Sequence, residues 1–353
     1  MMQTQQAPMG AAESWDTAAR RSEYDVTNRV RTTDSYAVRQ EVCRVLLNLY
    51  PDASSAPVSR AFSDCVLLYR GEGPGYRACD TAYHNLQHVL DVALATARLM
   101  DGYERAAGRW QPLGARLFTF GIVVALFHDI GYLRHRNDVR HSNGAEYTLR
   151  HVSRGARFLE RYMRDIGLPD LAHAAGRIIH FTGYEIPVAD IEVPSPVFRL
   201  IGNMLGTADI LAQMADRCYL EKCRDRLFPE FVAGGLARSG LGATPAPGVL
   251  FISAEDLLRK TPAFYGTALD RLNAQLGAAC HYFEAGFAGQ NPYLDVAGKN
   301  IRYAEQVAMK GDLALLRRVP PPSGVGGALA EPPRRMAAQD PGIEQGRALN
   351  SVA

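Results

Sequence analysis

A histidine and an aspartate end the most apolar stretch of the chain. Residues 118–132 read FTFGIVVALFHDIGY, in which His128 and Asp129 follow an otherwise apolar run. A helix that is apolar on all sides lies in a protein core, where an ionised carboxylate must be paired, hydrogen-bonded or bound to a metal. Imidazole and carboxylate together are typical ligands of zinc and similar divalent ions. The pair therefore indicates a metal site, and the alternative is a helix that ends near the surface with His128 and Asp129 as caps.

Two further stretches carry residues of the same chemical kind. In YHNLQHVLDV, residues 83–92, His84, His88 and Asp91 lie at i, i+4 and i+7, so we expect them to share one helical face. Such histidines can bind a metal or transfer protons, and the alternative is a solvated polar face. Asp209 lies in the apolar stretch LIGNMLGTADILAQM, where a carboxylate is rare unless it pairs with an arginine or binds a metal.

Composition limits the class of protein. The 353 residues are 47% hydrophobic with a net charge of +2, which indicates a globular chain and gives no electrostatic reason to expect nucleic acid or an anionic membrane as a partner. We expect no membrane span and no secretory signal. The six cysteines are scattered without C-x-x-C spacing, which is typical of reduced thiols, so we expect a cytoplasmic protein.

Apolar residues recur at helical spacing through most of the chain, and no stretch alternates with the period of a strand. We therefore predict an all-α fold, with one compact domain over residues 36–312. Residues 1–35 are expected to form a disordered arm, and the Pro- and Gly-rich residues 313–353 a disordered tail. Ser253 and Asp256 resemble a capping box for a further short helix, and residues 239–249 are expected to form a flexible loop. The predicted helices span residues 36–49, 58–69, 85–101, 115–130, 143–166, 169–181, 196–215, 217–233, 262–287 and 299–309.

Taken in order, H-N-x-x-H, then H-D, then a lone aspartate in an apolar helix resemble the HD-domain metal-dependent phosphohydrolases. The nearest branch is the class I cyclic nucleotide phosphodiesterases, whose Y-H-N-x-x-H-x-x-D-V signature is matched by residues 83–92. Residues 208–231, ADILAQMADRCYLEKCRDRLFPEF, are similar to the corresponding stretch of that family. The resemblance implies hydrolysis of a small-molecule nucleotide, from a 3′,5′-cyclic nucleotide to a 5′-monophosphate.

The resemblance also implies two divalent metal ions. His88, His128, Asp129 and Asp209 would hold the first ion, usually zinc, and Asp129 would bridge to a second, usually magnesium or manganese. His84 would protonate the leaving oxygen. Two such ions can activate a bridging hydroxide and neutralise a phosphoryl group, and a histidine that binds no metal suits the proton transfer.

The chain departs from the family pattern after the H-D pair, where a second histidine of the phosphodiesterases is replaced by Tyr132. His151 and His180 lie in segments that resemble the HD-GYP branch, in which comparable histidines bind the second metal. Because a lone histidine is usually structural, a surface or helix-end role is the alternative for both. The remaining histidines are interpreted as incidental: His135, His141, His173 and His281.

The substrate-binding positions also depart from the family. Tyr83 belongs to the matched signature, and Phe264 in TPAFYGTALDRL resembles the aromatic clamp on the base. Thr261 then occupies the position of the purine-binding glutamine, and its one hydroxyl cannot make the paired contacts of an amide. We expect weak preference between cAMP and cGMP, a different phosphodiester as the substrate, or base recognition by another residue such as Gln275.

Two other functions remain open from the sequence. One is an HD phosphomonoesterase acting on a nucleotide or another small phosphate ester. The other is a degenerate HD module that only binds a ligand or partner, although none of the four expected ligands of the first metal is missing. The sequence is compatible with a homo-oligomer and leaves the oligomeric state open.

Overall fold

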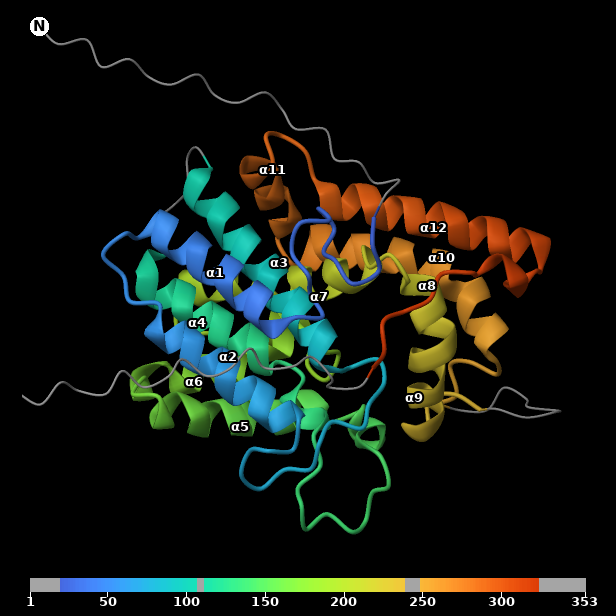
Figure 1. Ribbon diagram of the computed structural model, residues 1–353, viewed down its shortest axis with the longest axis horizontal. Helices are drawn as coiled ribbons and strands as arrows, with labels where there is room; N and C mark the ends of the chain where they lie inside the picture. Colours follow the sequence, from blue (N-terminus) through green and yellow to red (C-terminus); the bar gives the residue numbers. More distant parts are fainter. Residues whose placement is uncertain (1–19, 107–110, 239–247, 324–353) are drawn as a thin grey trace, which may run out of the picture.

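The computed structural model describes residues 20–106, 111–238 and 248–323, and within these ranges it is built of helices (Figure 1). Within the described ranges the β-type pairings are isolated bridges and are not part of a strand. They join Tyr24 to Arg31, Tyr76 to His135 and Ala237 to Phe251. The predicted all-α fold is therefore confirmed. The α-helices are α1 (Ser35–Leu49), α2 (Ala56–Tyr69), α3 (Leu86–Arg105), α4 (Gly114–Phe127), α5 (His151–Asp165), α6 (Ala172–Ile178), α7 (Pro196–Met214), α8 (Tyr219–Lys222), α9 (Phe228–Ala233), α10 (Ala254–Asp270), α11 (Tyr282–Gly286) and α12 (Pro292–Lys310).

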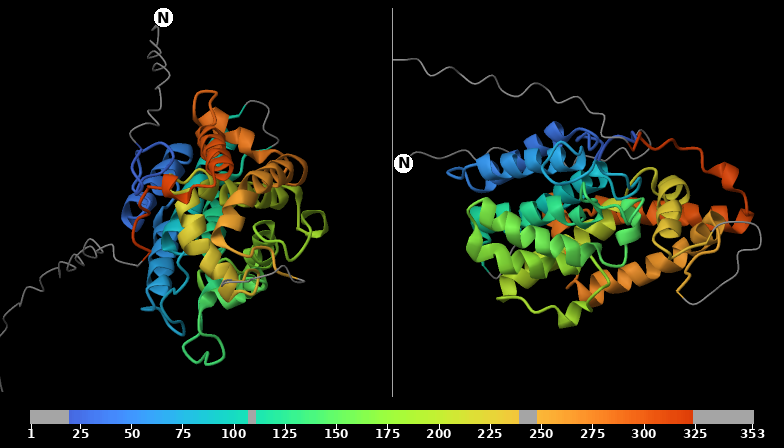
Figure 2. Two further views of the ribbon diagram at one scale, coloured as in Figure 1. Left: turned by 90° about the vertical axis from the view of Figure 1, so that its right-hand side faces the viewer. Right: turned by 90° about the horizontal axis from the view of Figure 1, so that it is seen from below.

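Helix α3 is the central element of the fold. It packs against α1, α4, α7 and α11, while α10 and α12 pair with each other at the opposite end from α5 and α6 (Figures 1 and 2). Asn85 caps α3, because its side-chain oxygen accepts the backbone N–H of His88 at 3.2 Å. The cap fixes where the helix begins and therefore the face on which His88 lies.

Glycines allow the core helices to approach closely. A Cβ atom at Gly121 of α4 would lie 1.9 Å from Cε of Met100 on α3, and one at Gly206 of α7 would lie 2.5 Å from the carbonyl oxygen of Phe181. Larger residues at these positions would push the helices apart. The packing of α4 on α3, and of α7 on the turn that ends at Phe181, therefore depends on small residues. Helix α3 carries His88, α7 carries Asp209, and His128 directly follows α4.

The apolar helix before the H-D pair is a core helix. Residues Gly114–Tyr132 are long and apolar enough to cross a membrane by length and composition, which corrects the expectation that no stretch reaches that length. However, 78% of its most apolar window is buried inside the protein, as in the core helix of a globular fold. The side chains of α4 fill the space between α2, α3 and α7.

The N-terminal boundary differs from the expected one. Residues 20–34 pack on the domain, although they were expected in the arm. The buried carboxylate of Asp25 accepts the backbone N–H of Val30 at 2.7 Å and pairs with Arg98 of α3 at 2.8 Å. Arg98 also donates to the hydroxyl of Tyr293 on α12 at 2.9 Å. This buried ion pair joins the N-terminal segment to two helices; residues 1–19 of the expected arm lie outside the described ranges.

Several predicted helices have different ends. The helix expected over 262–287 begins at Ala254, where Ser253 accepts the N–H of Asp256 at 3.1 Å, so that Pro262 lies inside it. A π-helical turn, Arg271–Gln275, ends it before Ala278, which has a positive φ of 50°. The helices expected over 143–166 and 217–233 are each interrupted, and the one expected over 299–309 begins at Pro292. The C-terminal boundary also differs: residues 313–323 were expected in the disordered tail but pack on the domain, where the backbone N–H of Arg318 donates to Oε1 of Glu221 at 3.1 Å. Most of the loop expected over 239–249, and the remaining tail residues 324–353, lie outside the described residues.

Candidate metal centre

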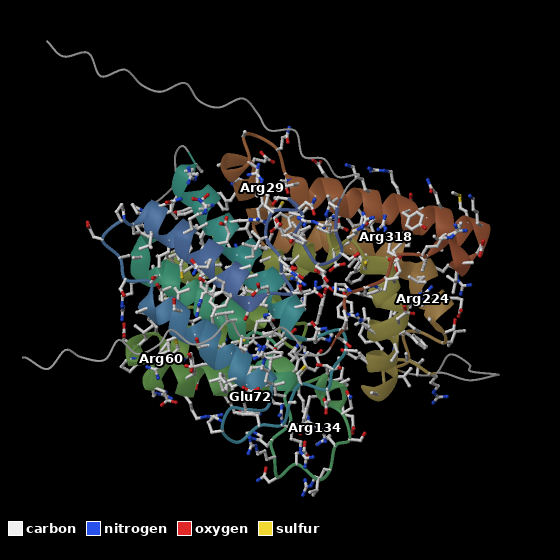
Figure 3. All side chains as sticks on the ribbon, viewed as in Figure 1. Arg29, Arg60, Glu72, Arg134, Arg224 and Arg318 are labelled. Atoms are coloured by element: carbon white, nitrogen blue, oxygen red, sulfur yellow. The ribbon has the colours of Figure 1, made fainter. Side chains whose placement is uncertain are left out.

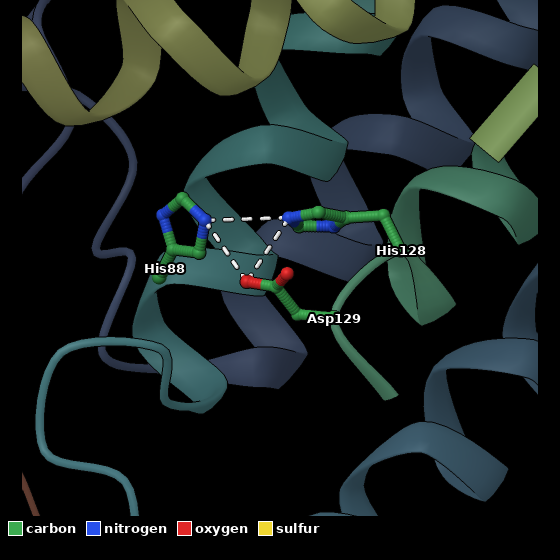
Figure 4. A group of neighbouring side chains, drawn as sticks. All are labelled: His88, His128 and Asp129. Atoms are coloured by element: carbon green, nitrogen blue, oxygen red, sulfur yellow. Dashed lines mark hydrogen bonds and ion pairs between the residues drawn. The ribbon is translucent and has the colours of Figure 1, made fainter. Parts of the chain in front are cut away.

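Three potential metal ligands converge in the core (Figure 4). His88 comes from α3, His128 caps the end of α4, and Asp129 follows it. The two Nε2 atoms lie 3.3 Å apart, and Oδ2 of Asp129 lies 3.3 Å from each of them. All three side chains are buried. The sequence prediction that these residues come together is confirmed.

Asp209 adds a fourth donor from α7. Its Oδ1 lies 3.2 Å from Nε2 of His88 and 3.7 Å from Nε2 of His128. Ligand bonds of about 2.0–2.2 Å to zinc place neighbouring donors about 3.0–3.5 Å apart in octahedral or tetrahedral geometry. Both separations are close to that range, so Asp209 and the two histidines can share a divalent ion. The tighter group, in which all ligand atoms lie within 4.8 Å of one another, consists of His88, His128 and Asp129.

The hydrogen bonding of the group also suits a metal. Oδ2 of Asp129 is buried and accepts no hydrogen bond of normal geometry, which is costly for a carboxylate oxygen unless a cation satisfies it. Nδ1 of His128 donates to the carbonyl oxygen of Ala125 at 2.8 Å, which leaves Nε2 as the nitrogen with a free lone pair in the neutral ring. The two features favour a cation at the point where the donors meet.

The electrostatics of the group point the same way. Burial alone would lower the pKa of His88, but the carboxylates of Asp129 and Asp209 outweigh it and raise the pKa to about 10. Burial would raise the pKa of Asp129, yet the neighbouring His128 and His88 hold it well below its usual value. The two carboxylates therefore favour a cation at this point, either a proton or a metal ion.

His84 lies beside the four ligands but is held by a different residue. Its ring centroid is 5.8 Å from that of His88, and its Nδ1 contacts Oε2 of Glu230 at 2.5 Å. Oε1 of Glu230 accepts the backbone N–H of Tyr83, also at 2.5 Å. With Nδ1 bonded to Glu230, Nε2 of His84 is the nitrogen that can exchange a proton with a bound molecule.

Glu230 was not assigned a role from the sequence. Its side chain lies on α9 and is only 4% exposed, which is unusual for a carboxylate. The sequence signal for this role was a single glutamate within the otherwise apolar stretch FPEF. Its contact with His84 joins residues 146 positions apart. Such a contact depends on how α9 packs against the segment before α3, which local sequence patterns do not reveal.

The expectation that His84, His88 and Asp91 share one helical face is wrong for His84, whereas His88 and Asp91 both lie on α3. Helix α3 begins at Leu86, so His84 lies in the preceding turn. Asp91 is on the helix, where burial raises its pKa to about 7 and its strongest charged neighbours are Lys222 and Asp216. Asp91 therefore belongs to a separate polar cluster.

The two candidate ligands of a second metal differ in position. His151 at the start of α5 has its Nε2 3.7 Å from Oδ1 of Asp129, and its Nδ1 donates to the carbonyl oxygen of Thr148 at 2.7 Å. Tyr132 stacks on His151 with ring centroids 4.3 Å apart. His180 is buried in a short 3-10 helix and has no hydrogen bond to Nδ1, and within the described residues it makes no ion pair with Asp129. Their role as metal ligands stays a prediction.

The expected substrate-binding residues already have partners or lie at the surface. The hydroxyl of Tyr83 donates to Oε1 of Gln213 at 2.9 Å, and that of Thr261 donates to the carbonyl oxygen of Leu257 at 3.0 Å. The side chain of Phe264 on α10 is 42% exposed. The binding of a base by these residues stays a prediction, and Tyr83 and Thr261 also have structural roles.

Comparisons with known proteins add no assignment. No protein-family model, curated protein or solved structure matches this chain.

Proposed function

We propose that this protein is a metal-dependent phosphohydrolase that converts a 3′,5′-cyclic nucleotide to a 5′-monophosphate. The observation that carries the proposal is the convergence of His88, His128, Asp129 and Asp209 from three core helices, with donor separations of 3.2–3.7 Å. The four residues are those that the resemblance to HD-domain phosphohydrolases assigned to the first metal.

The proposal gives the residues distinct tasks. The four converging side chains would hold the first divalent ion, for which zinc is expected. His151, whose Nε2 lies 3.7 Å from Oδ1 of Asp129, would support a second ion, magnesium or manganese. Ions at such a site lower the pKa of bound water and neutralise the charge on a phosphoryl group. The burial of the ligands excludes bulk water from their side of the site, which strengthens these interactions.

His84 supplies the proton that the leaving group needs. A hydroxide formed from water would add at phosphorus, the bond to the 3′ oxygen would break, and Nε2 of His84 would donate its proton to that oxygen. The proton lost by the water would then restore the protonated ring of His84. Glu230 fixes the ring through Nδ1 and so directs Nε2 away from itself. The task requires that His84 not be a metal ligand, and the residue that holds its ring is Glu230 rather than one of the four converging side chains.

A second candidate is an HD phosphomonoesterase that acts on a nucleotide or another small phosphate ester. The observation that favours it is Thr261, whose hydroxyl is bonded within its own helix at the position where the phosphodiesterases read the base with an amide. The same metal centre suits either ester, so the substrate panel decides between the two.

The test combines metal analysis with hydrolysis. Purified protein is analysed for bound metals and assayed on 3′,5′-cyclic, 2′,3′-cyclic and dinucleotide substrates and on phosphomonoesters. Asp129→Ala should abolish hydrolysis and lower the bound metal, whereas His84→Ala should keep the metal and slow turnover about 100-fold to 10,000-fold. Equal metal loss in both variants would make His84 a ligand, and a metal-bound wild type that hydrolyses none of these esters would leave a non-catalytic HD module.

A further inference from the structure

A pocket lies next to the loop that follows the H-D pair. It has a volume of about 130 Å³, and its walls include Ile130 and Gly131, which come directly after Asp129. The antiparallel bridge between Tyr76 and His135 closes one side, where the two rings stack with centroids 4.4 Å apart. Figure 3 labels Arg134 in the same loop, at the lower edge of the molecule.

The pocket is positively charged. Arg154, Arg157 and Arg161 contribute to its wall from one face of α5, where they lie at i, i+3 and i+7, and no aspartate or glutamate lines it. Throughout the described ranges, no ion pair within 4.0 Å joins any of these three arginines to a carboxylate. The local excess of positive charge is therefore not neutralised by the protein.

Arg154 is held in place by neutral groups. Its Nε donates to the carbonyl oxygen of Gly131 at 2.8 Å and its Nη2 to that of Leu133 at 2.9 Å, and its guanidinium lies 3.5 Å from the ring centroid of Tyr147. These contacts orient the cation without cancelling its charge. Arg157 and Arg161 are exposed on the same helix, one and two turns further along. A preorganised guanidinium beside two exposed ones is suited to an oxyanion.

The size of the pocket limits the ligand. Sites for whole drug-sized ligands usually have volumes of about 300–1,000 Å³, so this pocket has room for one tetrahedral oxyanion rather than an entire nucleotide. We propose that it binds a phosphoryl group, either as inorganic phosphate or as the terminal phosphate of a nucleotide whose base lies outside. Guanidinium groups recognise phosphate oxygens through paired N–H donors, and His135 can add another donor at the rim.

Binding there would stabilise the metal centre indirectly. Arg154 bonds to the two carbonyls that follow Asp129 in the chain, and Gly131 packs so closely on the carbonyl of His151 that a Cβ atom would lie 1.8 Å from it. An anion that fixes Arg154 therefore also fixes the loop that carries Asp129. The proposal does not rest on the proposed function, because it concerns binding at a separate group of residues.

The test is titration calorimetry of inorganic phosphate into the full chain after chelation, so that a metal-bound phosphate cannot contribute. One saturable site is expected. The double variant Arg157→Gln/Arg161→Gln should lower the affinity for phosphate by about 10-fold or more. One hydrogen bond to a charged group contributes about 10-fold to 100-fold in affinity, and the variant removes two charged donors. The matched control is Arg164→Gln, an exposed arginine of α5 outside the pocket, which should bind phosphate as the wild type does.

Two results would overturn the proposal: no saturable binding to the chelated wild type, or equal affinity in the wild type and the double variant. If chelation reduces the helical circular dichroism signal, the metal-loaded chain is titrated instead, and the double variant should then lack one phosphate site that Arg164→Gln keeps. A nucleoside monophosphate that displaces phosphate identifies a nucleotide as the source, and failure to displace it identifies free phosphate.

The outcomes also separate this proposal from the proposed function. A chain that binds phosphate in this pocket but hydrolyses no phosphate ester would refute only the proposed function. An active hydrolase whose chelated form binds no phosphate would refute only the second site.

Discussion

The contact between Glu230 and His84 gives a direct test of the proton-transfer role. In Glu230→Gln the side chain keeps its size, but an NH₂ group must face either Nδ1 of His84 or the backbone N–H of Tyr83, and both are donors. A hydrogen bond to a charged group contributes about 1.5–3 kcal/mol, and each 1.36 kcal/mol of barrier is about tenfold in rate. We therefore expect turnover to fall about 10-fold to 100-fold, with bound metal unchanged.

The assay is a double-mutant cycle. Turnover at saturating substrate, bound metal and thermal stability are measured for the wild type, Glu230→Gln, His84→Ala and the double variant. Because Glu230 acts through His84, the double variant should be no slower than His84→Ala alone. Losses that add in the double variant, or metal loss in Glu230→Gln, would refute the reasoning. The stability measurement is needed because Glu230 is buried and its replacement could also weaken the packing of α9.

Three further predictions follow from particular contacts. His151→Ala should remove the second equivalent of metal and keep the first, as measured by elemental analysis; loss of neither or of both would contradict its role. Asp25→Asn should lower the free energy of unfolding by about 3–5 kcal/mol at pH 7, since it leaves Arg98 buried without its carboxylate. Burial would raise the pKa of Asp25, but Arg98 and the local hydrogen bonds bring the pKa below the usual value of an aspartate. The stability from this ion pair is therefore fully present above that usual pKa and is lost as pH falls through the lowered one. Urea unfolding of the two proteins should converge in acid. Gly102→Ala should destabilise the protein by about 1–3 kcal/mol, because the added Cβ would lie 1.7 Å from a backbone carbonyl oxygen of α11. The control is Gly266→Ala, whose Cβ would meet no atom within 4 Å and which should not lower the melting temperature.

The parts of the fold that the sequence predicted well are those with strong apolar patterns. The helix expected over 196–215 is α7, Pro196–Met214, and the one expected over 115–130 contains nearly all of α4. Both helices bury most of their side chains, so the hydrophobic pattern determines their extent. The ends of α10 were harder to predict, because Pro262 resembles a first-turn proline, whereas the cap at Ser253 starts the helix earlier.

The candidate site also combines residues that the sequence reveals with contacts that it does not. His88, His128, Asp129 and Asp209 could be identified because metal-ligand residue types are unusual within apolar helices. Their convergence required the close packing of α3, α4 and α7, which the sequence did not specify. Glu230 and the pocket lined by Arg154, Arg157 and Arg161 were missed, because each depends on contacts between segments far apart in the chain.

The two expected metal positions differ in how the fold supports them. The first set of ligands comes from core helices whose side chains are almost fully buried, so its geometry is fixed by the same packing that stabilises the fold. His151 instead begins α5, whose first turn is held by Glu185, a residue from a different loop that accepts the backbone N–H groups of Val152 at 3.0 Å and Ser153 at 3.1 Å. A carboxylate cap of this kind contributes about 0.5–2 kcal/mol, far less than a core. The second position should therefore be the one that responds to changes in its surroundings, including an anion that fixes Arg154 one turn along the same helix.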